Sequence, residues 1–284
     1  MDKKISIFEV GPRDGLQNIK NEIPTNKKIE LINILSATGI KKIECGSFVS
    51  AKWIPQMKGT DQIFQEISRK DGVKYTALTP NLKGFENAVN AQVDEIAVFA
   101  AASETFSQKN VNCSIEESLE RFQDIFKQAK GKKMPVRGYV SCIVECPYEG
   151  KVSPEIVLKV ASRLLDMGCY EVSLGDTIGK GTPKTVEALL KVICENLNVE
   201  QLAGHFHDTT ETAIKNVEVG LKYGISTFDT AIGGLGGCPY APGAKGNLST
   251  VQLINAIGIN NFDSALDLEE LLYAEKYLVN LLKN

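Results

Sequence analysis

Short segments rich in strand-forming residues recur eight times along the chain, at a fairly even spacing. They are residues 5–10, 42–45, 74–78, 95–99, 136–143, 171–174, 202–206 and 227–231. Stretches with helical periodicity lie between many of them, among them residues 26–38, 115–128, 154–167, 183–196 and 210–223. Strands and helices that alternate in this way form parallel βαβ units with right-handed crossovers, so few topologies are open to the chain.

Eight such units in roughly 250 residues favour a closed (β/α)₈ TIM barrel, and we expect one catalytic domain over residues 1–284. An open doubly wound sheet is the alternative, but no Gly-x-Gly-x-x-Gly follows the first strand. Leucines at helical spacing also predict an additional C-terminal helix at about residues 263–284. We expect this helix to pack on the barrel, and a contact within a homodimer is the other interpretation.

Composition narrows the classes of partner. A net charge of −3 argues against a nucleic-acid partner, because phosphate-binding proteins usually carry a basic excess. The longest apolar run, residues 96–102, is far shorter than the roughly 20 residues of a membrane span. The N-terminal residues lack a signal-peptide pattern, and the seven cysteines form no Cys-x-x-Cys pair. We therefore expect a cytoplasmic protein with reduced thiols and no membrane partner.

Unusual polar residues follow several of the predicted strands. Arg13 and Asp14 come after the first strand, Glu44 lies on the second, and Asp176 follows the sixth. The seventh strand carries His205 and His207, the chain's only two histidines. In a barrel of this type the chemistry sits at the carboxyl ends of the strands, so we expect these residues at one rim.

The His-x-His pair suggests a metal site. Residues two apart on a strand face the same side, about 6.6 Å apart along the chain, close enough for both imidazoles to bind one ion. A pair of hydrogen-bonded core histidines is the structural alternative. Together with Asp14 and Asn247 they make a mixed nitrogen and oxygen set that suits Mg²⁺ or Mn²⁺. From spacing alone, Asn247 is better explained as a turn residue or a helix N-cap before residues 248–250.

Arg13, Glu44 and Asp176 are candidate catalytic residues. Arg13 is either a surface ion pair with a neighbouring acid or a fixed cation for a developing oxyanion. Glu44 and Asp176 would be costly inside a barrel mouth unless they are paired. Cys238 lies in a loop with six glycines between residues 233 and 246, which could close over a ligand. A buried, inert thiol is the default interpretation of such a cysteine.

Eight segments together carry a resemblance to a known family. They are residues 9–18, 47–50, 52–57, 78–81, 138–142, 146–151, 173–179 and 234–240. In these segments the chain resembles the 3-hydroxy-3-methylglutaryl-CoA lyases, with a match from about residue 5 to residue 255. The Arg-Asp turn and His-x-His are shared with the wider barrel family of isopropylmalate and homocitrate synthases, whereas the cysteine loop resembles the lyases alone.

The resemblance implies a Mg²⁺ or Mn²⁺ site formed by Asp14, His205, His207 and Asn247. It also implies that Arg13 stabilises an enolate, that Cys238 takes part in proton transfer, and that Glu44 and Asp176 support the site. The implied reaction cleaves 3-hydroxy-3-methylglutaryl-CoA to acetoacetate and acetyl-CoA. A lyase for another 3-hydroxyacyl-CoA, or a Claisen-condensing acyltransferase of the synthase type, is the alternative.

Two departures from the lyase pattern concern the substrate. Thr210 and Glu211 replace the usual Tyr-Gly, and Glu145 stands where glycine normally occurs. Asp208 to Glu211 has the spacing of a capping box, which would make Glu211 part of a helix start. If the two glutamates instead faced the pocket, they would repel an anionic acyl-CoA.

Overall fold

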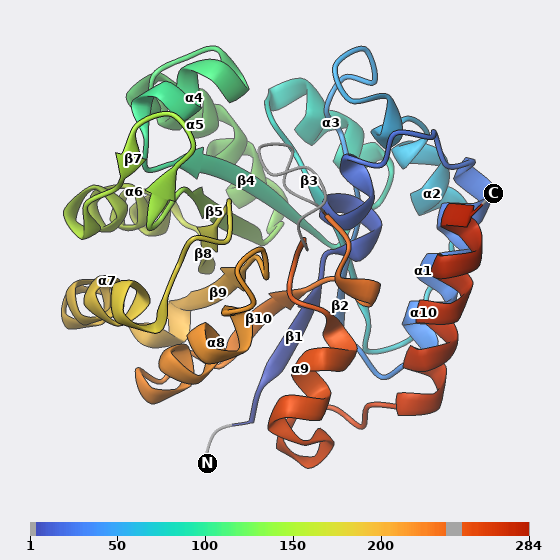
Figure 1. Ribbon diagram of the computed structural model, residues 1–284. Helices are drawn as coiled ribbons and strands as arrows, with labels where there is room; N and C mark the ends of the chain where they lie inside the picture. Colours follow the sequence, from blue (N-terminus) through green and yellow to red (C-terminus); the bar gives the residue numbers. More distant parts are fainter. Residues whose placement is uncertain (1–3, 237–245, 284) are drawn as a thin grey trace.

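A closed barrel of eight parallel strands forms the centre of the molecule, in a computed structural model that describes residues 4–236 and 246–283 (Figure 1). The strands are β1 (Ser6–Glu9), β2 (Lys42–Ser47), β3 (Lys74–Leu78), β4 (Glu95–Ala101), β5 (Val136–Ser141), β8 (Glu171–Asp176), β9 (Leu202–Phe206) and β10 (Thr227–Thr230). Their order around the barrel is β1-β10-β9-β8-β5-β4-β3-β2. The predicted (β/α)₈ fold is confirmed, with one barrel strand in each predicted segment.

Helices surround this barrel (Figure 1). They are α1 (Thr25–Ala37), α2 (Thr60–Glu66), α3 (Leu82–Asn90), α4 (Glu104–Val111), α5 (Ile115–Lys132), α6 (Pro154–Met167), α7 (Pro183–Asn196), α8 (Ala213–Lys222), α9 (Thr250–Ile257) and α10 (Leu268–Lys283). Local sequence signals fix several of their ends. Ser114 and Glu117 form a capping box at the start of α5, and Gly168, with φ of 115°, ends α6 in the left-handed conformation. None of the helices in the described ranges is long and apolar enough to cross a bilayer.

The C-terminal helix packs on the barrel through α1, beside which it lies (Figure 1). Leu271, Ala274 and Leu278 are its buried residues, and the Tyr277 hydroxyl donates to Glu30 Oε2 at 2.8 Å. The helix begins at Leu268 and not near residue 263 as predicted. The reason is local, because Asp267 Oδ1 accepts hydrogen bonds from the Glu269 and Glu270 amides.

Helix α8 also begins later than the sequence pattern predicts. Glu211 has a φ of 59°, a left-handed conformation that cannot belong to a helix, and Asp208 Oδ1 accepts from the amide of Ala213 instead. The capping box expected from Asp208 to Glu211 is therefore wrong. Glu211 lies two residues before the first residue of the helix, and it is exposed.

Strand β5 ends two residues before its predicted limit, because Cys142 adopts a φ of 62°. The chain then forms a small antiparallel hairpin of β6 (Glu145–Cys146) and β7 (Gly150–Lys151). This hairpin follows the carboxyl end of β5, on the side of the barrel where the predicted site residues gather.

Candidate metal centre and active site

A tight π-helical turn, η1 (Gly11–Gly15), follows β1 and carries Arg13 and Asp14. The Val10 carbonyl accepts from the amides of Arg13, Asp14 and Gly15, which fixes the turn at the barrel mouth. The amide of Gly11 donates to Glu9 Oε1 at 2.8 Å. A Cβ at Gly11 would lie 2.5 Å from that oxygen, so the close approach requires glycine here.

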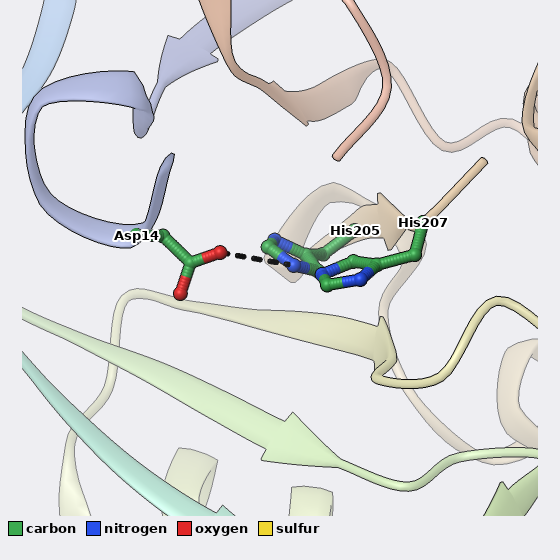
Figure 2. A group of neighbouring side chains, drawn as sticks. All are labelled: Asp14, His205 and His207. Carbon is green, nitrogen blue, oxygen red and sulfur yellow. Dashed lines mark ion pairs between the residues drawn. The ribbon is translucent and has the colours of Figure 1, made fainter. Parts of the chain in front are cut away.

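Asp14, His205 and His207 form a compact group of metal-ligand type (Figure 2). One possible ligand atom from each residue lies within 4.8 Å of the others. His205 Nε2 is 4.0 Å from Asp14 Oδ2, and the two imidazole centroids are 5.2 Å apart. The His-x-His pair therefore meets an acid from another strand end.

Asn247 joins this group through its neighbours. It pairs with His207 in an isolated antiparallel bridge, and its Nδ2 donates to Asp14 Oδ2 at 2.8 Å and to the Leu235 carbonyl at 3.0 Å. Ser249 and not Asn247 caps α9, so the N-cap interpretation of Asn247 is wrong. A Cβ at Gly236, whose φ is 100°, would lie 2.4 Å from Asn247 Nδ2.

Two buried polar atoms of the group lack a hydrogen-bond partner within the described residues. They are His207 Nδ1 and Asn247 Oδ1. An unsatisfied buried oxygen acceptor such as Asn247 Oδ1 is costly, and a divalent cation satisfies an acceptor of this kind. The donor set of Asp14, His205, His207 and Asn247 thus fits a divalent metal ion.

The local electrostatics favour the ligand forms of these side chains. Burial opposes the charge of Asp14, but the Arg13 guanidinium and the two imidazoles hold the pKa of its carboxyl well below the usual range. Burial and the adjacent His205 lower the pKa of His207 to about 4. At neutral pH the site therefore offers a carboxylate and a neutral imidazole, which are the forms that bind a metal.

Arg13 lies beside this group in a buried ion pair. Its Nε is 2.5 Å from Glu44 Oε2, and its Nη1 is 2.6 Å from Asp14 Oδ1. The guanidinium carbon lies 5.4 Å from the centroid of the Tyr139 ring, whose hydroxyl donates to Glu44 Oε1 at 3.3 Å. Arg13 is 6% exposed, so the interpretation as a surface ion pair is wrong. A fixed, buried cation next to a metal site can stabilise a developing oxyanion.

Asp176 ends strand β8 and is fully buried. Its carboxylate accepts from the amides of Lys180 at 3.1 Å and Gly181 at 2.7 Å. Burial, with a smaller contribution from the negative charge of Glu145, raises its pKa to about 6 against these hydrogen bonds. The half-buried Glu145 on the β6–β7 hairpin is therefore close enough to Asp176 to act on it, whereas Glu211 is exposed.

Two buried acids of the site were not among the predicted residues. Asp229 on β10 bonds His205 Nδ1 at 3.1 Å, and Glu9 on β1 accepts from Gly11, Ile232 and Thr250. Both are charged residues within predicted barrel strands, which is the signal that could have identified them. Cys238, the predicted proton-transfer residue, lies outside the described residues.

A (β/α)₈ barrel with a group of metal-ligand type and a buried arginine at one mouth is typical of metal-dependent barrel enzymes. The chain belongs to the HMGL-like family, whose model matches residues 4–278. The resemblance to 3-hydroxy-3-methylglutaryl-CoA lyases is thereby confirmed.

Relatives and solved structures agree with this family. The chain is 50% identical over 265 residues to the hydroxymethylglutaryl-CoA lyase of Pseudomonas mevalonii. The alignment covers 93% of this chain and 88% of the relative. It is 50% identical over 274 residues to a 3-hydroxy-3-isohexenylglutaryl-CoA/hydroxy-methylglutaryl-CoA lyase of Pseudomonas aeruginosa, covering 96% of this chain and 91% of that one. The crystal structure of the HMG-CoA lyase from Brucella melitensis aligns with a TM-score of 0.97 and 48% identity, over 99% of this chain and 100% of that chain.

Proposed function

We propose that this chain is a carbon–carbon lyase that cleaves 3-hydroxy-3-methylglutaryl-CoA to acetoacetate and acetyl-CoA with Mg²⁺ or Mn²⁺. The observation that carries the proposal is the buried Arg13 held by Glu44 and Asp14 directly beside the group of Asp14, His205 and His207. Near-full-length relatives that carry lyase names support the same reaction.

Asp14, His205, His207 and Asn247 would hold the metal ion. When bound, such an ion acts as a Lewis acid that lowers the pKa of the substrate's C3 hydroxyl. Oxygen and imidazole ligands suit several divalent ions, and affinity alone would favour zinc over magnesium. We propose Mg²⁺ or Mn²⁺, because two of the four ligands are oxygen donors.

The reaction needs one proton removed, one bond broken and one proton returned. Transfer of the C3 hydroxyl proton to a base lets that oxygen form the ketone of acetoacetate as the C2–C3 bond breaks. The electron pair of that bond passes to the thioester as an enolate, and protonation at C2 gives acetyl-CoA. The guanidinium of Arg13 stabilises the enolate oxygen, because it stays charged and donates hydrogen bonds in a fixed plane.

The remaining predicted residues serve this sequence of steps. Glu44 orients Arg13 through the 2.5 Å ion pair and is itself held by Tyr139. Asp176, with a pKa of about 6, is a carboxylate at neutral pH and supports the site electrostatically. Cys238 takes part in proton transfer, since a thiol with an ordinary pKa is mostly protonated at neutral pH and can donate to the enolate.

One assay tests the proposal. The full chain is incubated with 3-hydroxy-3-methylglutaryl-CoA and Mg²⁺ or Mn²⁺, and acetoacetate and acetyl-CoA are measured. We expect equal amounts of both products, and none from a matched sample with EDTA. A folded chain that binds Mn²⁺ and forms neither product would contradict the proposed reaction.

A longer acyl group is the second candidate. The Pseudomonas aeruginosa relative bears a name with both an isohexenyl and a methyl substrate, at 50% identity to this chain. Comparing kcat/KM for the two acyl-CoA thioesters separates the candidates. A higher value for the isohexenyl compound would assign it as the preferred substrate.

We propose a homodimer in the cytoplasm. The outer side of α10 carries the exposed apolar side chains Leu272, Tyr273 and Val279, and twofold dimers are the commonest oligomers.

The six cysteines within the described residues carry free thiols, which suit a reducing compartment such as the cytoplasm. Light scattering that gives the mass of one chain would contradict the dimer, and a fluorescent fusion located elsewhere in the cell would contradict the compartment.

A further inference from the structure

A line of buried hydrogen bonds runs inside the barrel and ends at His205. Arg137 on β5 donates from Nε to Glu171 Oε1 at 2.7 Å and from Nη2 to Asp229 Oδ1 at 2.8 Å. Asp229 on β10 in turn lies 3.1 Å from His205 Nδ1 through its Oδ2. These residues come from four strands, so the line depends on closure of the barrel.

Asp229 is held rigidly within this line. It is 1% exposed, and both of its oxygens have fixed partners. Besides Arg137 on Oδ1, the Ser173 hydroxyl donates to Oδ2 at 2.7 Å. Arg137 is itself fixed by Glu171 and by the Phe8 ring, whose centroid lies 4.0 Å from the guanidinium carbon. The position of Oδ2 opposite His205 is therefore set by partners that are independent of the metal centre.

We propose that Asp229 is a positioning residue that selects the tautomer of His205. A carboxylate only accepts hydrogen bonds, so the ring nitrogen that faces Asp229 Oδ2, Nδ1, must carry the proton. The lone pair of Nε2 is then free on the opposite side of the ring, where Asp14 Oδ2 lies 4.0 Å away. This inference rests on the proposed metal centre but not on the identity of the substrate.

The substitution Asp229→Asn tests this role because Arg137 dictates how the amide must lie. Arg137 Nη2 can only donate, so the amide oxygen takes the place of Oδ1 and the NH₂ group takes the place of Oδ2. That NH₂ group then donates to His205 Nδ1 and leaves the proton of the neutral ring on Nε2. The same logic explains why an aspartate-to-asparagine change beside a catalytic histidine traps the wrong tautomer.

The first measurement is Mn²⁺ affinity of the full chain without substrate, from the electron paramagnetic resonance signal of free Mn²⁺. We expect Asp229→Asn to weaken binding by about 10- to 100-fold, the usual cost of removing an outer partner of a metal-binding histidine. Glu95→Gln is the matched control, since Glu95 is another buried barrel carboxylate, bonded to Lys42 and Tyr170 and not to His205. Equal affinity losses in the two variants, or an unchanged affinity in Asp229→Asn, would overturn the proposal.

The second measurement is the position of the proton on His205, from ¹⁵N chemical shifts of the metal-free protein at about pH 8.5, above the ordinary range for imidazole titration. The chain has only two histidines, so His207→Gln assigns the signals. We expect Nδ1–H in the wild type and in Ser173→Ala, which keeps the carboxylate, and Nε2–H in Asp229→Asn. The same tautomer in wild type and Asp229→Asn would overturn the proposal. A wild-type chain that binds no Mn²⁺ would contradict the proposed metal centre. The tautomer of His205, measured in the metal-free protein, would then be the test of the role of Asp229.

Discussion

Substitutions in the buried ion pair between Arg13 and Glu44 can distinguish an effect on catalysis from an effect on stability. Arg13→Gln removes the cation that would meet the enolate, and we expect a rate loss of about 10²- to 10³-fold, as for loss of an oxyanion-stabilising donor. It also leaves Glu44, which is fully buried, without its cationic partner. Breaking a buried pair on one side costs about 3–5 kcal/mol of unfolding free energy.

This loss has a testable dependence on pH. Burial already raises the pKa of Glu44 against the pull of Arg13, and without Arg13 the pKa rises further. A folded-state pKa above the unfolded value means that the contribution to stability is present at low pH and is lost as pH rises. The gap in melting temperature between Arg13→Gln and wild type, roughly 6–20 °C for about 3–5 kcal/mol at about 2–4 °C per kcal/mol, should therefore widen from acid to alkaline pH.

The double variant Arg13→Gln/Glu44→Gln is the control. Arg13 and Glu44 are then both replaced by neutral side chains of similar size, so the unpaired charge at Glu44 is removed, and most of the lost melting temperature should return. Lyase activity should stay low, because the cation is still absent. Thermal melts followed by circular dichroism measure the stability, and acetoacetate release measures the lyase activity. A fully active Arg13→Gln, or a double variant no more stable than Arg13→Gln, would refute the reasoning.

Three further predictions concern the metal, the thiol and the pH profile. His207→Ala removes one of the proposed ligands and should abolish both Mn²⁺ binding and turnover, and exhaustive chelation of the wild type should do the same; full turnover after chelation would contradict the metal centre. Cys238→Ser should fold with an unchanged melting temperature and lose about 10²- to 10⁴-fold in rate, so an unchanged rate would make Cys238 a structural thiol. The acid limb of the kcat/KM profile should lie near the pKa of Asp176, about 6. The negative charge of Glu145 raises that pKa, so Glu145→Gln should move the acid limb to lower pH. An acid limb that stays in place in Glu145→Gln, with Glu211→Gln as the exposed control, would show that Glu145 does not act on the site.

The sequence determined the barrel and much of the site, because both depend on order along the chain. Eight strands alternating with helices leave few topologies, and parallel strands bring all their carboxyl ends to one rim. Asp14, His205 and His207 could therefore be expected to meet, although they are about 190 residues apart in the sequence. The resemblance added Asn247, for which spacing alone favoured a turn residue or a helix N-cap.

Only the tertiary structure decided which partners each buried charge has. The pairing of Arg13 with Glu44, and of Asp229 with Arg137, Ser173 and His205, depends on side-chain directions across a closed barrel. Periodicity gives the face of a strand but not its register against a strand far away in sequence. The left-handed Glu211 lies between Thr210 and Thr212, whose hydroxyls donate to the carbonyls of Gly179 and Gly181, and these long-range contacts could not be read from the local pattern. Burial then sets the charge states of the site, because desolvation and the nearest opposite charge act only once the barrel has closed.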